Sequence, residues 1–305
     1  MALASTLARE QRAFLGRDRR RWGPHLERIR AFLGEGLAQA RGPALVLGAG
    51  SGLEVPWALA PPGTAGWDAD PLSRLRTLLR HRRWAPWEFG DLTGGMAALG
   101  SLALRSARQP WSGRVRATRT ATRRLAGLIG SLEPDAAPLA RWLDAHGPAT
   151  ILAANVMGQF GVLAHRTVEQ AFRGCDPWAP GEDDDDPLDA ALRDWTARAV
   201  GAFLGTLGAS GADLWLVHDR GVLFGDARVA LGPLAEPWTA QLLATVPLEA
   251  DDPLCGVDVL KAFPGRELER HQRWVWPVAQ GQTHVMEALR VRGAGAAGDP
   301  GRPGA

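Results

Sequence analysis

Three glycines and two aspartates have the types and spacing needed to bind a nucleoside. Gly48, Gly50 and Gly52 alternate with other residues directly after a short apolar run. Glycine permits backbone angles and close approaches that a Cβ atom would block. Asp68 and Asp91 follow two further strand-like segments, and carboxylates accept charge-assisted hydrogen bonds from hydroxyl and amino groups. The pattern predicts a nucleotide- or nucleoside-binding turn with two acidic contacts.

A parallel sheet would bring these residues together at one edge. Residues 44–47 are short and apolar and follow Gly42-Pro43, as is typical of a strand buried on both faces. We expect a helix from near Leu53 to Ala60. Its free N–H groups and positive dipole end would then face the ligand.

The remaining chain alternates predicted strands with predicted helices, which favours βαβ units and a parallel α/β sheet. Helical spacing also predicts two helices within 92–132, separated at Gln109-Pro110, and a further helix over 237–246. The predicted strands are 44–47, 64–67, 84–89, 149–154, 212–217, 273–278 and 283–291. The other predicted helices lie in 1–40, around 72–79, and over 135–146, 160–172 and 189–207.

The expected domain organisation is one large α/β unit with helical additions. Residues 1–42 are predicted to form an N-terminal helical cap, and 43–292 the Rossmann-like domain. Residues 93–132 are an Arg-rich helical insert in that domain. The segment 293–305 contains only Gly, Ala, Pro, Asp and Arg, so we expect a disordered tail.

Composition limits the classes of protein that need to be considered. The chain has 305 residues, 46% of them hydrophobic, and a formal net charge of +2, which does not favour nucleic acid on bulk charge. Neither a spanning apolar run nor a secretory signal is evident, so we expect a cytoplasmic protein without membrane contact. Cys175 and Cys255 lack metal-ligand spacing, so we predict no metal.

The glycine spacing distinguishes between nucleotide ligands. A dinucleotide turn has a small residue at its third conserved position, but Leu53 stands there. A phosphate-binding P-loop is excluded, because no Gly-Lys-Ser/Thr follows the turn. A nicotinamide-dependent oxidoreductase is therefore disfavoured.

The spacing Gly48-x-Gly50-x-Gly52 resembles motif I of the class I S-adenosylmethionine-dependent methyltransferases. That resemblance implies a Rossmann-like, doubly wound fold with a mostly parallel seven-stranded sheet whose last strand is antiparallel. It also implies that Asp68 binds the ribose hydroxyls and that Asp91 lies near the adenine. The family usually has an acid two residues before the first glycine, where this chain has Val46. The cofactor-binding set that the resemblance implies is Gly48, Ala49, Gly50, Gly52, Asp68, Ala69, Asp91, Leu92 and Asn155.

Two residues are candidates for the chemistry. Asn155 follows the fourth predicted strand, where the resemblance places motif IV beside the methyl donor. His218 follows the fifth predicted strand, and a histidine there could serve as general base or simply be a hydrogen-bonded loop residue. The resemblance predicts a methyltransferase, and the residues do not name its methyl acceptor or its oligomeric state.

A binding module without catalysis is the alternative. Seven arginines and no acid lie between residues 92 and 132. The stretch Arg105–Arg124 could bind RNA or an acidic partner, although a solvated helical face is the favoured interpretation. The valine at position 46 also favours this alternative modestly.

Overall fold

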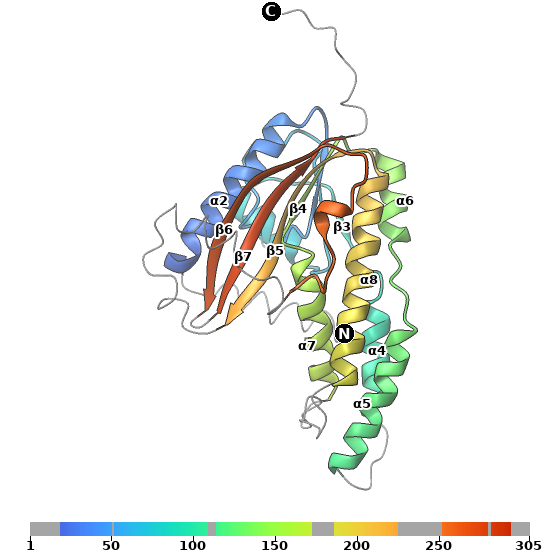
Figure 1. Cartoon of the computed structure of the whole chain (residues 1–305). Coiled ribbons are helices and arrows are strands. Elements are labelled where there is room, and N and C mark those ends of the chain that lie inside the picture. Colours follow the sequence, from blue (N-terminus) through green and yellow to red (C-terminus); the bar gives the residue numbers. More distant parts are fainter. Residues whose placement is uncertain are drawn as a thin grey trace, which may run out of the picture.

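The computed structural model describes residues 19–50, 52–108, 114–172, 186–224, 252–279 and 282–293. They form a twisted central sheet with helices on both faces (Figure 1). The strand order is β3-β2-β1-β4-β5-β7-β6. The strands are β1 (Ala44–Leu47), β2 (Ala65–Asp68), β3 (Trp87–Phe89), β4 (Thr150–Ala154), β5 (Asp213–Phe224), β6 (Leu268–Ala279) and β7 (Gln282–Val291).

Strand directions match the predicted fold class. The first five strands pair in parallel, whereas β7 is antiparallel to both β5 and β6. The prediction of a Rossmann-like, mostly parallel seven-stranded sheet with an antiparallel last strand is therefore confirmed. The chain order reverses between β1 and β4, where open α/β sheets form a ligand crevice at the carboxyl ends of their strands.

Nine helical segments lie among the described residues. Two of them, η1 and η2, are short 3₁₀ helices. The nine segments are α2 (Arg19–Gln39), η1 (Trp57–Leu59), α3 (Ser73–His81), α4 (Met96–Ala107), α5 (Arg114–Gly130), α6 (Ala137–His146), α7 (Gly158–Ala171), α8 (Pro187–Ala209) and η2 (Val259–Lys261).

Successive residues of the inner strands are buried on opposite faces of the sheet, as strand geometry requires. In β1, Leu45 and Leu47 belong to the core that the sheet shares with helices α4 to α8. Ala44 and Val46 belong to the second core, formed with α2 and η1. The N-terminal helix α2 thus shares a core with the sheet.

The helix predicted after the glycine turn is wrong. Residues 52–55 form bends, and only η1 is helical there. Pro56 cannot donate the backbone hydrogen bond that a continuing helix needs, and Pro61-Pro62 closes the segment. Arg30 Nε donates to the Leu53 carbonyl at 2.6 Å, which ties the segment to α2. The turn therefore lacks the helix dipole that the sequence suggested.

Other boundaries also differ from prediction. Strand β3 begins at Trp87 because residues 82–86 have no regular structure, and residues 237–246 lie outside the described part of the chain. Strand β5 continues past residue 217 to Phe224, because antiparallel β7 extends beyond the parallel strands and pairs with it. His218 therefore lies within β5 and not in a loop.

Within the described ranges, no helix has the length and apolar character needed to cross a membrane.

Candidate functional site

The glycine turn after β1 depends on glycine at each described position. Gly48, Gly50 and Gly52 have φ values of +64°, +52° and +67°, in the left-handed region that side chains disfavour. The Gly48 amide donates to the Trp67 carbonyl at 2.9 Å, which fixes the turn against β2. A Cβ atom on Gly48 would lie 2.9 Å from Cβ of Val156, so the turn also packs against the loop after β4.

Asp68, the last residue of β2, holds the turn from the other side. Its Oδ2 accepts the Gly50 amide at 2.6 Å, and its Oδ1 accepts the Asp70 amide at 2.7 Å. Burial raises the pKa of Asp68 to about 6, against the lowering effect of these two amides. Each carboxylate oxygen has two lone pairs, so both oxygens can accept one more donor.

Asp70 serves the following helix. Its Oδ1 accepts the Leu72 amide at 2.9 Å, and its other oxygen pairs with Arg76. Asp70 thus stabilises the turn that leads into α3, whose N-cap residue is Leu72, whereas Asp68 lines the pocket described below.

Asp91 binds the backbone at the start of α4 and also lines the pocket. Its Oδ1 accepts the Thr93 amide and hydroxyl at 2.9 and 2.7 Å, and its Oδ2 accepts the Met96 amide at 2.7 Å. It thereby caps the start of α4. The same residue also lines the pocket described below, and its Oδ2 keeps one unused lone pair.

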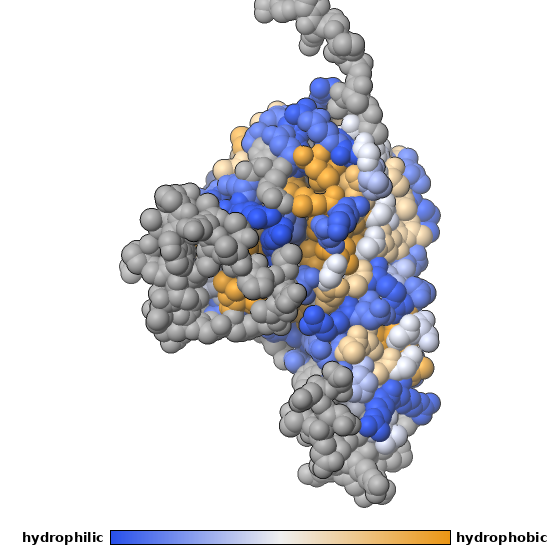
Figure 2. Space-filling model, viewed as in Figure 1, coloured by the Kyte–Doolittle hydropathy of each residue, from blue (hydrophilic) through white to orange (hydrophobic). Residues whose placement is uncertain are grey.

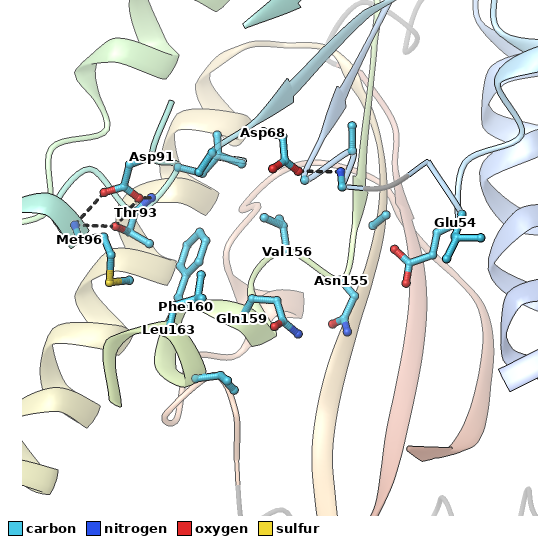
Figure 3. A pocket seen from close by; sticks show the side chains of 18 of the residues that line it. Glu54, Asp68, Asp91, Thr93, Met96, Asn155, Val156, Gln159, Phe160 and Leu163 are labelled. Carbon is cyan, nitrogen blue, oxygen red and sulfur yellow. Dashed lines mark hydrogen bonds between the residues drawn. The ribbon is translucent and has the colours of Figure 1, made fainter. Parts of the chain in front are cut away.

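One pocket of about 260 Å³ joins these parts at the carboxyl edge of the sheet (Figure 3). In Figure 3, Asp91, Met96 and Phe160 lie at one end and Glu54 lies at the opposite end, with Asp68 beside the turn and Asn155 between the two ends. The predicted residues among its lining are Gly48, Ala49, Gly50, Asp68, Ala69, Asp91, Leu92 and Asn155. Gly52 is not among them, and its carbonyl instead accepts a hydrogen bond from His81 at 2.8 Å.

His218 does not line the pocket either. It is 3% exposed, its Nδ1 lies 3.0 Å from the Asp219 carbonyl oxygen, and its Nε2 lies 3.5 Å from Glu287. Burial alone would raise the pKa of Glu287, but its contacts with His218 and Arg273 lower that pKa to about 2. This geometry favours a structural ion-pair network over the general base considered from the sequence.

Asn155 joins the two ends of the pocket. It has a φ of +50° and is 5% exposed, and its backbone N–H donates to the Val217 carbonyl at 2.8 Å. Its side-chain oxygen has no hydrogen-bond partner among the described residues. Such a buried acceptor is costly unless a donor reaches it. A polar ligand in the pocket could supply that donor.

The structure adds a histidine that the sequence argument did not select. His284, on β7, lines the pocket, and its Nδ1 lies 2.9 Å from Oδ1 of the buried Asp219. Its Nε2 faces the amide nitrogen of Gln282 at 3.0 Å. The sequence signal was weak, since His284 and Asp219 are 65 residues apart and only the pairing of β5 with β7 brings them together.

We define the distal end of the pocket as the lining residues Trp22, Glu54, Trp276, Val278, Gln282 and His284. The Trp22 and Trp276 rings meet edge to face with centroids 4.6 Å apart. The His25 ring stacks on Trp276, with the two ring centroids 3.9 Å apart. Its Nε2 lies 3.8 Å from Oε1 of Glu54. None of these residues carried a motif, so sequence reasoning missed this end completely.

Two other chemistries receive no support in the described part of the chain. It contains no group of three or more His, Cys, Asp or Glu side chains placed to hold a metal ion. Burial raises the pKa of the Cys255 thiol to about 11, so that thiol stays protonated and weakly nucleophilic near neutral pH.

Comparisons with known proteins give little beyond the fold. No family model matches the chain, and no curated protein matches it. One similar solved structure is the N-methyltransferase NodS from Bradyrhizobium japonicum WM9 in complex with S-adenosyl-L-homocysteine, at 13% identity. The alignment covers 87% of this chain and 86% of that chain, with a TM-score of 0.34.

Proposed function

We propose that this protein is an S-adenosylmethionine-dependent methyltransferase. One observation carries the proposal: the glycine turn, Asp68, Asp91 and Asn155 line a single pocket at the carboxyl edge of the sheet. That edge is where α/β sheets bind nucleotides and related cofactors. The acids follow neighbouring strands, so one nucleoside could contact both of them.

The residues fit the cofactor that the motif resemblance implies. Asp68 would accept hydrogen bonds from the ribose diol, because both its oxygens keep an unused lone pair. Asp91 and the apolar side chains Leu92, Met96 and Phe160 would hold the adenine, since a flat base needs apolar walls and a polar edge contact. The turn at Gly48 and Gly50 allows the close backbone approach that the methionine part requires.

The chemistry needed from the side chains is modest. When bound, the sulfonium cofactor supplies an activated methyl group. The chain must then orient the acceptor for in-line transfer and keep water out of the pocket. Asn155, at the junction of the two ends, is placed to orient either ligand through its buried side-chain oxygen.

Calorimetric titration with S-adenosylhomocysteine tests the proposal. We expect binding to the wild-type chain and a loss of about 100-fold or more in Asp68→Ala, which removes the ribose contact and the support of Gly50. Asp144→Ala, a substitution at an exposed aspartate in α6, is the control and should bind like the wild type. No binding by the wild type, or equal binding by Asp68→Ala, would contradict the proposal.

Binding without catalysis is the second candidate, and one surface favours it. Arg105, Arg108, Arg123 and Arg124 are all exposed on or beside α4 and α5. Figure 2 shows hydrophilic residues over α5 in the lower part of the helical layer. An RNA mobility-shift assay discriminates: salt-sensitive binding that is lost in Arg123→Glu/Arg124→Glu, with no turnover of any acceptor, would support this candidate.

A further inference from the structure

We propose that the distal end of the pocket binds the methyl acceptor as an amine in its ammonium form, held by Glu54, Asn155 and two indole rings, with His284 as the proton acceptor. The inference rests on the proposed methyltransferase function and names the substrate class of that site. Four features of this end support it, and each is a property of different side chains.

The first feature is a carboxylate that has no Lys or Arg partner among the described residues. The Glu54 side chain is 17% exposed and lines the pocket, and the titratable group facing it is His25 at 3.8 Å. Trp274 Nε1 donates to His25 Nδ1 at 3.0 Å, so Nδ1 is an acceptor and the ring is neutral. Within the distal end as the described residues define it, there is no Lys or Arg. A largely buried carboxylate in this position favours a cationic ligand.

The second feature is the unpartnered oxygen of Asn155. This acceptor is buried and lies where the two ends of the pocket meet. An ammonium group carries up to three N–H donors and no acceptor, so it can satisfy Asn155 and Glu54 together. An ether or carboxylate ligand has no donor to offer either group.

The third feature is the pair of indole rings. Trp22 and Trp276 are 3% and 4% exposed and both line the pocket. Their edge-to-face contact and the stack of Trp276 on His25 fix both rings in place. Rigid indoles bind organic cations through their electron-rich faces and cover the alkyl part of the same ligand.

The fourth feature is a base oriented by a buried acid. Since Asp219 accepts from Nδ1 of His284, the neutral ring has its lone pair on Nε2, which accepts from Gln282. Asp219 on β5 is the charged group that contacts this ring, Trp276 lies between it and His25 with its centroid 5.5 Å from that of His284, and Glu54 lines the same pocket. An acceptor amine that displaces the Gln282 amide would meet this lone pair.

His284 takes the proton that the bound ammonium must lose before methyl transfer. The ammonium N–H bond breaks, the proton moves to Nε2 of His284, and the imidazolium that forms is stabilised by Asp219. The nitrogen lone pair released in this step forms the new C–N bond. The electron pair of the broken S–C bond stays on the sulfur, and His284 later returns its proton to solvent.

Ligand-observed NMR titrations of the full chain with benzylamine, benzyl alcohol and benzoate test the binding site. They are run with S-adenosylhomocysteine present, and cofactor binding is measured separately by calorimetry. We expect benzylamine, which is cationic near neutral pH, to bind about tenfold or more tightly than the other two probes. Glu54→Gln should abolish this preference and leave S-adenosylhomocysteine binding unchanged.

Glu27→Gln is the matched control, since it removes the same charge from an exposed position on α2 and should preserve the preference. Equal binding of the three probes, or a preference for benzoate or benzyl alcohol, overturns the inference and leaves the proposed function intact. Failure of the wild type to bind S-adenosylhomocysteine overturns both.

A pH profile of methyl transfer to benzylamine tests His284 separately. For the wild type, kcat/KM should level off at a pH below the pKa of the amine, because His284 accepts the proton of the bound ammonium. In His284→Gln the neutral amine must come from solution, so kcat/KM should rise about tenfold per pH unit up to the pKa of the amine. Parallel profiles for the two proteins would remove His284 from the proton transfer.

Discussion

The two ends of the pocket are built in different ways. At the nucleoside end, which comprises the glycine turn, Asp68 and Asp91, carboxylates bind backbone amides no more than 18 residues away, as in Asp68 with Gly50 and Asp91 with Met96. At the distal end, contacts join side chains far apart in sequence, such as His25 with Trp274 and Asp219 with His284. The first end is a set of local turns fixed by neighbouring strands. The second exists only after α2 and β7 have packed against the rest of the sheet. Changes in long-range packing should therefore damage the distal end first.

The largest effect is expected for Glu287→Gln, which tests whether the β5–β7 region supports only the distal end. Glu287 is 1% exposed, and its Oε1 accepts from Arg273 at 2.6 Å. Removing its charge leaves the partly buried guanidinium groups of Arg273 and Arg220, 18% and 25% exposed, without their carboxylate, so the free energy of unfolding should fall by about 3 kcal/mol. Urea denaturation measures this. The folded fraction should still bind S-adenosylhomocysteine with wild-type affinity.

Glu267→Gln is the control for that substitution. Glu267 faces Arg292 at 3.3 Å but is exposed, so the change should stay within about 0.5 kcal/mol. Similar losses for both variants would mean that the buried network adds nothing particular to this region. Loss of cofactor binding in Glu287→Gln would mean that the two ends are not independent.

Gly48→Ala tests the nucleoside end. Its φ of +64° is strained for alanine, and the added Cβ would lie 2.9 Å from Cβ of Val156. We expect a loss of about 2 kcal/mol in unfolding free energy and at least about tenfold in S-adenosylhomocysteine affinity. Thermal unfolding and calorimetry measure the two effects. Gly127→Ala, with no atom within 4 Å of its added Cβ, should be neutral or stabilising.

The sequence predicted residues of the nucleoside end but none of the distal end. The turn at Gly48 and the acids Asp68 and Asp91 could be predicted because each follows a short strand with its own local signal. The strand pattern predicted the sheet for the same reason. Trp22, Glu54 and His284 could not be selected, because no spacing in the sequence relates them.

The errors have equally specific causes. The expected helix after the turn failed because Pro56 and the tie from Arg30 to Leu53 act against local helical spacing. His218 was misplaced because β5 was expected to end with its parallel neighbour. Pairing with antiparallel β7 extends β5 and buries that histidine instead.

Gly158→Ala should disturb the region of Asn155, where the two ends of the pocket meet, more than the nucleoside end. A Cβ there would lie 2.3 Å from Oδ2 of Asp219 and 3.2 Å from Oδ1 of Asn155. Displacing these two side chains should cost about 1–2 kcal/mol and weaken benzylamine binding more than S-adenosylhomocysteine binding. Calorimetry and NMR titration compare the two ligands. Gly161→Ala, one turn further along α7 with its nearest atom at 3.4 Å, should change neither affinity.

The smallest effect is a pH dependence that belongs to the nucleoside end alone. Burial raises the pKa of Asp68 to about 6, although the Asp70 and Gly50 amides oppose this. A ribose diol donates to the ionised form, so binding must release the proton held below that pH. Between about pH 7.5 and pH 5, S-adenosylhomocysteine affinity should fall about tenfold, and calorimetry in two buffers should detect the released proton. Asp68→Asn should bind more weakly and show no such slope.

Asp68 should also make the free energy of unfolding depend on pH, in the opposite direction to cofactor affinity. An unfolded aspartate titrates near about 3.9, so the folded state holds more protons between about pH 4 and pH 6. Asp68 therefore lowers the unfolding free energy as the pH rises through this window, and Asp68→Asn removes that contribution. Comparing urea unfolding of the two proteins at both limits isolates it. If the difference between them does not change with pH, Asp68 is ionised throughout the window, and the pH dependence of cofactor binding must come from another group.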